Sequence, residues 1–265
     1  MKNIYFASDF HLNKDVLHTS AIREKYIVGW LLSIQSTADT IYLVGDLFDY
    51  WYEYGTVIPR GNDLFKATLL QLRLSGVNIE IFTGNHDVWM KDYFENDLDI
   101  KIHRNPISVT HHGKSLYIGH GDGLGPGDSG YKLLKRIFTS RLCQWLFSRL
   151  HPNFAIRFMK ACSQLSSKYN TDSDLDTQSI NLSEEWLSQY SESVNAEQYH
   201  DYYLYGHRHI PIKYQLKNGK SYYYNLGDWM NHYTYGVLQK GELSIKSYLK
   251  KEATILTNQV SQQAT

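Results

Sequence analysis

The stretch Ile41-Tyr42-Leu43-Val44-Gly45-Asp46-Leu47-Phe48-Asp49 joins a short apolar run to a glycine and two carboxylates. An apolar run of this length, bounded by glycine and polar residues, is typical of a strand buried inside a layered α/β domain. The glycine lets the backbone turn tightly, so that a carboxylate follows the strand almost directly. Open α/β sheets place their sites in loops at the carboxyl ends of strands. The stretch therefore predicts a functional site at the end of a central strand.

The same arrangement occurs four more times along the chain. The other runs are Ile4–Ala7 before Asp9-Phe10-His11, Val77–Phe82 before Gly84-Asn85-His86-Asp87, Leu116–Ile118 before Gly119-His120-Gly121-Asp122, and Tyr202–Tyr205 before Gly206-His207-Arg208-His209. A single histidine is usually structural or exposed, and the remaining ones of the 12 histidines are interpreted in that way. Five motifs that each follow a strand predict one composite site.

The residue types in these motifs are those that bind transition metals. Carboxylates, an amide oxygen such as that of Asn85, and imidazoles suit Mn, Fe or Zn. Two cations roughly 3.5–4 Å apart can polarise a phosphoryl group and acidify water. Asp46 is the candidate carboxylate shared by both ions, because it ends a central strand and precedes Asp49. The candidate imidazole donors are His11, His120, His207 and His209. His207 and His209 alternate by two residues, which in strand geometry would place them on one face.

In this order the motifs resemble those of the calcineurin-like metallophosphoesterases, over about residues 1–250. The resemblance implies an α/β fold, a two-sheet αββα sandwich with the site at one edge. It implies one metal held by Asp9, His11, Asp46 and His209, and a second held by Asp46, Asn85, His120 and His207. His86 matches the family's histidine that is not a ligand and that protonates the leaving oxygen or stabilises the transition state. Asp87 would orient that histidine.

Three further stretches resemble the UDP-2,3-diacylglucosamine diphosphatase family of lipid A biosynthesis. They are Gly45–Trp51, His120–Asp122 followed by Asp128-x-Gly130-Tyr131, and Leu226–Trp229. The resemblance implies that two divalent ions, Mn²⁺ in the first instance, support hydrolysis of the pyrophosphate of UDP-2,3-diacylglucosamine to lipid X and UMP. The substrate contacts that it implies are Asn85, Asp128, Tyr131, Arg157 and Lys168. The chain departs from the pattern at His86, where much of that family has arginine.

The segment between His120 and His207 carries an unusual charge pattern. Residues 131–171 contain lysines and arginines but no aspartate or glutamate, and the following stretch to His207 is acidic. Large apolar residues fall at helical spacing, which predicts one amphipathic helix and, after Pro152, a second that begins near Asn153. Their stripes are Leu134, Ile137, Phe138, Leu142, Trp145, Leu146 and Leu150, then Phe154, Phe158, Cys162 and Leu165.

Two interpretations of these helices remain open. In one, an amphipathic pair packs its apolar face on the core, and its charges are solvated. In the other, residues 130–200 form a helical cap that houses acyl chains and turns basic residues toward phosphate or anionic lipid. The family resemblance implies the second interpretation.

Length and composition fit one domain with an insertion. At 265 residues the chain can bury one large core, predicted over residues 1–250 and followed by a polar tail over 251–265. Cys143 and Cys162 have no CxxC spacing and are interpreted as reduced thiols of a cytoplasmic protein. The start leaves no room for a signal peptide, and no apolar run approaches the ~20 residues of a membrane span. The expected location is the cytoplasm, peripheral on the inner membrane, with no obligate protein partner.

Three other classes of function fit the sequence less well. A soluble calcineurin-like phosphodiesterase or phosphatase acting on nucleotides or phosphoproteins would need no apolar cap. A scaffold that keeps the fold and binds protein partners has no chemical need for every ligand. A nuclease is disfavoured because the formal net charge is zero, so no bulk attraction to nucleic acid is expected.

Overall fold

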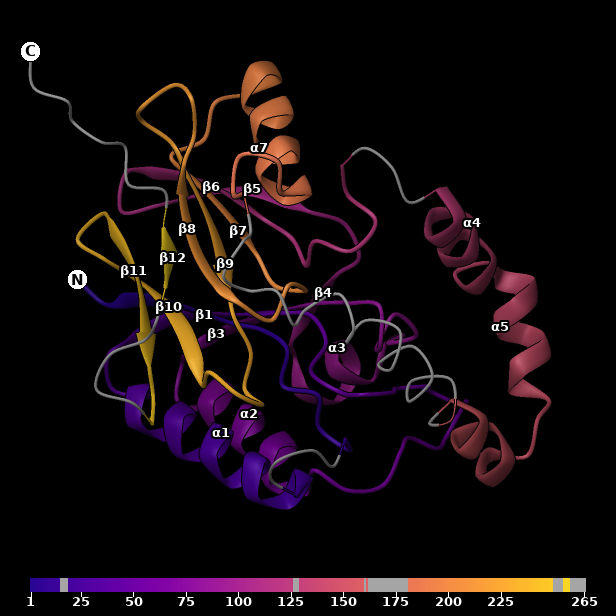
Figure 1. The fold of residues 1–265 in the computed structure, drawn as a ribbon. Helices are drawn as coiled ribbons and strands as arrows, with labels where there is room; N and C mark the ends of the chain where they lie inside the picture. Colours follow the sequence, from indigo (N-terminus) through magenta and orange to yellow (C-terminus); the bar gives the residue numbers. More distant parts are fainter. Residues whose placement is uncertain (15–18, 126–128, 160, 162–180, 250–254, 258–265) are drawn as a thin grey trace, which may run out of the picture.

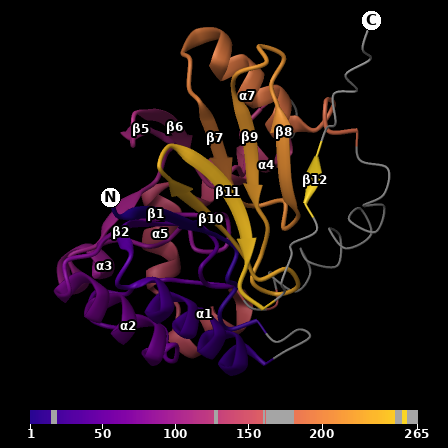
Figure 2. The same cartoon turned by 90° about the vertical axis from the view of Figure 1, so that its left-hand side faces the viewer.

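The computed structural model describes residues 1–14, 19–125, 129–159, 161, 181–249 and 255–257. In this part of the chain two six-stranded sheets lie face to face, and helices cover their outer faces (Figures 1 and 2). The α/β fold and the two-sheet αββα sandwich that the family resemblance implies are therefore confirmed.

The first sheet has the strand order β11–β10–β1–β2–β3–β4. The strands in this order are Glu242–Ser247, Thr234–Gln239, Asn3–Ala7, Ala38–Val44, Asn78–Phe82 and Lys101–His103. β1 to β4 pair in parallel, whereas β10 and β11 are antiparallel and extend the sheet beside β1. The carboxyl ends of β1, β2 and β3 therefore lie at the same edge.

The second sheet has the order β12–β8–β9–β7–β6–β5. The strands in this order are Leu256–Thr257, Pro211–Gln215, Tyr222–Leu226, Tyr202–Tyr205, Lys114–Ile118 and Ile107–His111. β6, β7 and β9 are parallel neighbours, so β6 and β7 also end at one edge. Leu256 and Thr257 of the predicted tail thus contribute the edge strand β12 to this sheet.

Apolar side chains fill the space between the sheets and the space under the helices. Phe6 and Tyr42 of the first sheet pack with Leu204 of the second in the central layer. Helices α1 (Ser20–Ile34), α2 (Asp63–Leu74) and α3 (Tyr93–Leu98) cover the outer face of the first sheet through a core that contains Trp30, Phe65 and Phe94. Helix α7 (Trp186–Glu197) packs on the second sheet through Leu187.

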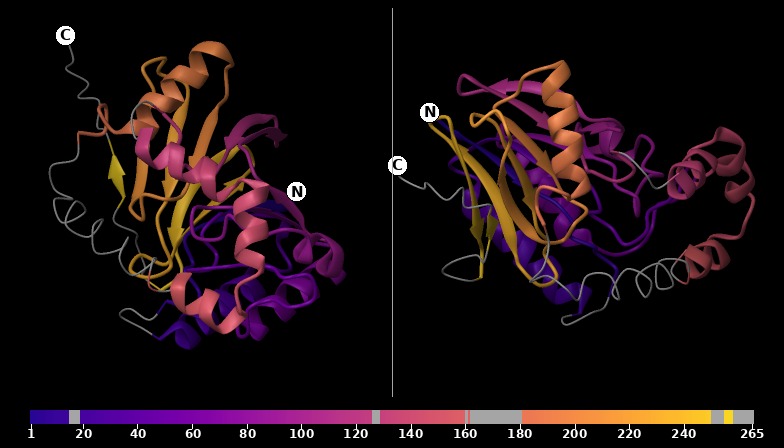
Figure 3. Two further views of the ribbon diagram at one scale, coloured as in Figure 1. Left: turned by 90° about the vertical axis from the view of Figure 1, so that its right-hand side faces the viewer. Right: turned by 45° about the horizontal axis from the view of Figure 1, so that its top comes forward.

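Of the segment predicted to be a cap, residues 130–200, the structure describes α4 (Ser129–Phe138), α5 (Arg141–Ser148) and a helix over residues 152–159, which lie on one side of the sandwich (Figures 1 and 3) and are called the cap below. Helix α7 also falls within the predicted bounds, but it packs on the second sheet. The prediction of a single helix up to Leu150 is wrong, because the helix ends before Thr139 and a new one begins after Ser140. Their hydroxyls bond backbone carbonyls of α4, and the Ser140 side chain accepts from the N–H of Cys143 and begins α5. The next helix begins at Pro152, close to the predicted start, since proline fits the first helical turn.

The rest of the predicted cap is only partly described. Residues 162–180, which include Cys162 and Leu165 of the second stripe, lie outside the described residues. None of the helices in the described segments is long and apolar enough to cross a membrane.

Candidate metal centre

The predicted site residues lie in loops that follow parallel strands of both sheets. Asp9 and His11 follow β1, Asp46 follows β2, Asn85, His86 and Asp87 follow β3, His120 follows β6, and His207 and His209 follow β7. Backbone hydrogen bonds connect neighbouring loops: the N–H of Asp9 donates to the carbonyl of Gly45, and that of His11 to the carbonyl of Asp46, each at 3.0 Å. Residues nearly 200 positions apart are therefore brought together at one edge.

The backbone of this centre is strained at its candidate ligands. The residues in the left-handed region are Asp9 at φ 56°, His11 at 44°, Asp46 at 52°, His207 at 69° and His209 at 56°. Such conformations cost non-glycine residues about 1–3 kcal/mol each and cluster at functional sites. The expectation that His207 and His209 share a strand face is wrong, because both lie in the turn after β7 and their rings join different groups.

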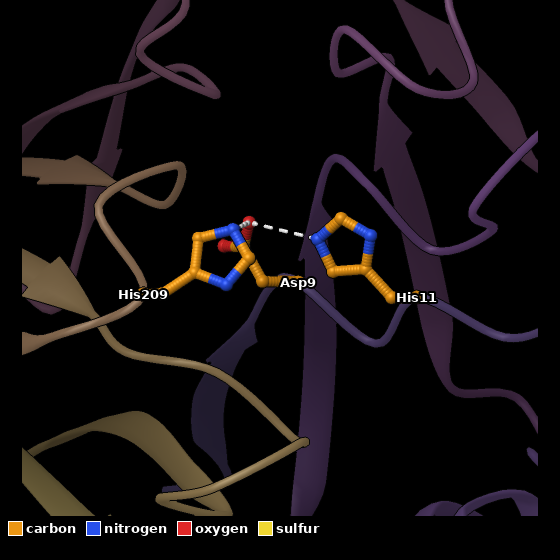
Figure 4. Close-up of side chains that lie close together, drawn as sticks. All are labelled: Asp9, His11 and His209. Atoms are coloured by element: carbon orange, nitrogen blue, oxygen red, sulfur yellow. Dashed lines mark ion pairs between the residues drawn. The ribbon is translucent and has the colours of Figure 1, made fainter. Parts of the chain in front are cut away.

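One group consists of Asp9, His11 and His209 (Figure 4). The Asp9 Oδ1 atom lies 3.4 Å from His209 Nε2 and 3.8 Å from His11 Nε2. Asp9 Oδ1 and His11 Nε2 are buried without a hydrogen-bond partner among the described residues. A buried carboxylate oxygen that faces two imidazole nitrogens without hydrogen bonds is the arrangement expected of a cation site.

A second group consists of Asp46, His120 and His207, with Asn85 beside it. The Asp46 Oδ2 atom lies 3.3 Å from His120 Nε2 and 3.7 Å from His11 Nε2 of the first group. The Asn85 Oδ1 atom lies 2.9 Å from His207 Nδ1 and 3.4 Å from His120 Nε2. One oxygen of Asp46 thus lies between the two groups, where a carboxylate shared by two ions would have to be.

The pKa values of the histidines report how negative this buried region is. Burial by itself disfavours an imidazolium, yet neighbouring carboxylates outweigh it and raise the pKa of His11 to about 9 and that of His120 to about 10. Burial, then the nearby charge of His120, lowers the pKa of His207 to about 4. Carboxylates that keep neighbouring imidazoles protonated to such high pH also attract a divalent cation, so the donor set fits divalent metal binding.

His86 lies at the rim of the centre and contacts both the first group and the loop after β2. Its ring is 14% exposed and stands edge-on to the ring of His11, with centroids 4.8 Å apart. Its Nδ1 lies 3.0 Å from the backbone carbonyl oxygen of Asp49, which can only accept, so Nδ1 donates. His86 also forms a group with His11 and Asp46 in which the donor atoms lie within 4.8 Å of one another.

Asp87, which was expected to orient His86, bonds backbone groups with its carboxylate. The Asp87 carboxylate is fully buried and accepts hydrogen bonds from the backbone N–H groups of Gly84 and Leu47, each at 2.7 Å. It therefore fixes the loops after β2 and β3 to each other. The imidazole of His86 instead meets Asp49, through its carbonyl oxygen and through Oδ1 at 3.6 Å from Nδ1.

Asp49 and Asp228 are site residues to which sequence reasoning gave no role. Asp49 Oδ1 also lies 3.5 Å from His11 Nδ1, on the opposite side of that ring from Asp9. Asp228 Oδ2 lies 3.7 Å from His209 Nδ1. Carboxylates in these positions orient ligand imidazoles and set their tautomers. Their positions in the sequence could have indicated such a role, because Asp49 lies in the motif that contains Asp46 and Asp228 lies in the motif that ends at Trp229.

The structure describes only some of the residues that were expected to contact the substrate. Asn85 is in the centre, as described above, and Arg157 is exposed on the helix over 152–159. Tyr131 lies within α4. Asp128 and Lys168 lie outside the described residues.

Gly84 permits the close approach of the loops after β2 and β3. A Cβ atom at this position would lie 2.2 Å from Asp46 Oδ1 and 2.6 Å from Asp46 N, whereas a Cβ on Gly55 would meet nothing within 4 Å. Gly84→Ala is expected to lower metal affinity roughly 10–100-fold, the range seen when residues that support ligands are changed. Metal titration of Gly84→Ala and of the control Gly55→Ala measures this. Equal affinity in the two variants would contradict the assignment.

The sandwich and this donor constellation together define a protein of the metallophosphoesterase class. No family model matches the chain. A UDP-2,3-diacylglucosamine hydrolase from Porphyromonas gingivalis is 31% identical over 254 residues, which cover 92% of this chain and 97% of that protein. The chain therefore belongs to the UDP-2,3-diacylglucosamine hydrolase family.

More distant relatives carry the same name. One from Haemophilus influenzae (strain PittGG) is 25% identical over 94% of this chain and 100% of that protein, and one from Histophilus somni (strain 2336) is 24% identical over 86% and 93%. Among solved structures, a conserved protein from Streptococcus pneumoniae described as a phosphoesterase matches with a TM-score of 0.44 and 13% identity, covering 96% of this chain and 92% of that one.

Proposed function

We propose that this protein hydrolyses the pyrophosphate of UDP-2,3-diacylglucosamine to lipid X and UMP in lipid A biosynthesis. The observation that carries the proposal is the near full-length match to a protein named for that substrate, in a chain that keeps every candidate ligand. The convergence of these ligands on one edge supports hydrolysis rather than a binding role alone.

Two divalent cations, with Mn²⁺ as the first candidate, are the proposed cofactors. The first would be held by Asp9, His11, Asp46 and His209, and the second by Asp46, Asn85, His120 and His207. When bound, such ions polarise phosphoryl oxygens and acidify water. The burial of Asp9 and Asp46 and the position of Asp46 Oδ2 between the groups support this assignment.

The protein's own residues are proposed to orient the imidazoles of the candidate ligands and to supply a proton to the leaving oxygen. His86 donates from Nδ1 to the Asp49 carbonyl, so the proton for the oxygen that leaves phosphorus would come from Nε2–H of the imidazolium form, although burial lowers the pKa of this ring. Asp49 and Asp228 hold the rings of His11 and His209. The buried Asp87 keeps the loop that carries His86 against the loop that carries Asp46.

The cap is the proposed site for the acylated part of the substrate. Several of its large apolar side chains are exposed, among them Leu142 at 68% and Trp145 at 53%. Basic side chains accompany them, and Arg149 lies 4.8 Å from the centre of the Trp145 ring. A surface of this kind suits acyl chains and anionic lipid, which supports peripheral binding at the cytoplasmic face of the inner membrane.

The test of the reaction is mass spectrometry of products after incubation with UDP-2,3-diacylglucosamine and Mn²⁺. Release of UMP together with lipid X is the expected result, and chelation of the metal should abolish it. Release of UDP, or turnover of soluble nucleotides or phosphoproteins alone, would overturn the proposal and favour a soluble phosphodiesterase or phosphatase.

The acyl-chain role predicts a difference between two substrates. Leu142→Gln and Trp145→Gln replace exposed side chains, so folding should be little affected. Lost contact with two methylenes at ~0.8 kcal/mol each lowers kcat/KM for the lipid substrate by about tenfold. Bis-p-nitrophenyl phosphate should be cleaved as before, and Leu32→Gln on the exposed side of α1 is the matched control. Equal losses on both substrates would show that the cap only supports the fold.

A further inference from the structure

The cap is attached to two loops of the metal centre by aromatic residues. Trp89, three residues after His86, donates from Nε1 to the carbonyl of Phe138 at 2.7 Å, and the Tyr52 hydroxyl donates to the carbonyl of Gln144 at 2.8 Å. The Phe147 ring packs on both, with centroids 4.7 Å from Tyr52 and 4.6 Å from Trp89. These contacts fix α5 and the carboxyl end of α4 to the loops after β2 and β3.

A third attachment is an ion pair between α4 and the loop after β6. Lys135 Nζ lies 2.6 Å from Asp122 Oδ2 and 3.3 Å from the Asp122 carbonyl oxygen. Asp122 is 4% exposed and stands two residues after the candidate ligand His120, whereas the Lys135 side chain is 34% exposed. One turn earlier, Lys132 donates to the carbonyl of Gly125 in the same loop. Two lysines of the basic segment are thus directed at the protein rather than at solvent.

The burial of Asp122 indicates more than a surface ion pair. Exposed pairs contribute little, but removing the partner of a buried carboxylate is costly, so the contact holds its geometry. Trp89 holds the carboxyl end of α4 at Phe138, and Lys132 bonds the loop after β6 near the other end of the helix. Lys135 lies one turn before Phe138 and, through its buried carboxylate partner, opposes a pivot of the helix about that end.

We propose that Lys135 and Asp122 are positioning residues that hold α4 against the loop after β6 and so set where the cap meets the acylated part of the substrate. The inference rests on the proposed function, because the position of the cap affects activity only if the substrate carries acyl chains. The residues act through α4 and touch no reacting atom.

The test compares two substrates in the Lys135→Met variant, with Mn²⁺ present. For UDP-2,3-diacylglucosamine, kcat/KM is expected to fall roughly 10–100-fold, as for other residues that act through a neighbour, and mainly through KM. Bis-p-nitrophenyl phosphate should be cleaved within about threefold of the wild-type rate, because on this proposal the pair does not act on the chemistry. Lys135→Arg should retain most activity. Lys25→Met, which removes an exposed helical lysine on α1, is the matched control.

A double variant tests whether the two residues act together. Asp122→Asn with Lys135→Met should be no worse on the lipid substrate than Asp122→Asn alone, because the contact can be lost only once. Additive losses would overturn the proposal. Equal losses on both substrates in Lys135→Met, or unchanged lipid kinetics, would overturn it too.

Hydrogen exchange separates this inference from the proposed function. Backbone amides of Ser129–Phe138 should exchange several-fold faster in Lys135→Met than in the wild type or in Lys25→Met. If the wild type does not cleave the lipid substrate, the proposed function fails, and unchanged exchange in α4 would separately refute the ion pair as the restraint on this helix.

Discussion

Asp46→Asn is expected to lower kcat by about a thousandfold and to weaken metal binding at both positions. One oxygen of Asp46 lies between His11 and His120, at 3.7 and 3.3 Å from their Nε2 atoms, so the loss of its charge reaches both groups. Lewis-acid stabilisation is worth several kcal/mol, and each ~1.4 kcal/mol is tenfold in rate. Asparagine keeps the shape of the side chain and an oxygen for the 2.9 Å hydrogen bond from the N–H of His86, so the fold should survive.

Metal content and turnover of the purified variant decide this prediction. Asp39→Asn is the matched control, because Asp39 is exposed on the same strand. Two tightly bound ions with normal turnover in Asp46→Asn would refute the shared-carboxylate assignment. Loss of one ion only would show that Asp46 belongs to a single group.

The sequence predicts that the candidate ligands lie close together, because each of them stands next to a strand. Parallel strands end at a common edge, so the position of Asp9, Asp46 or His120 after an apolar run already places it near the others. The left-handed backbone at Asp9 and Asp46 was not predictable in the same way, because it follows from packing two loops within hydrogen-bond distance of each other.

Contacts between side chains of different loops escape the sequence pattern. Asp87 adjoins His86 along the chain, which made it the expected partner, but its side chain turns inward to the N–H groups of Leu47 and Gly84. Asp49 is far from His86 in sequence and meets it only because the loops after β2 and β3 lie together. Sequence neighbours and spatial neighbours differ most in such loops.

In the cap, the periodicity of apolar residues did not predict where the helices end. The spacing of apolar residues through Leu142 and Trp145 is continuous, yet the helix breaks at Thr139 and Ser140 because their hydroxyls compete for backbone groups. Periodicity also could not distinguish a stripe that packs on the core from one that remains exposed. The large exposed fractions of Leu142 and Trp145 favour a stripe that does not pack on the core.

His86→Ala is expected to lower kcat by ~10²–10⁴-fold, the usual contribution of a general acid or base, while both metals stay bound. The ring lies at the rim of the centre, and its Nδ1 is already engaged with the Asp49 carbonyl. Both candidate metal groups keep their donors without it, namely Asp9 with His209 and Asp46 with His120. The substitution should therefore remove a proton donor without removing a ligand.

The measurements are kcat with both substrates and metal content, with the exposed His151→Ala as the control. Loss of an ion in His86→Ala would show that the group formed by His11, Asp46 and His86 binds metal, and the proton-donor role would have to be dropped. His86→Arg addresses the departure from the family pattern directly. Arginine carries a permanent positive charge but cannot lose a proton, so activity retained by His86→Arg and lost in His86→Ala would show that charge stabilisation is the contribution. Loss in both variants would show that proton transfer from the imidazole is required.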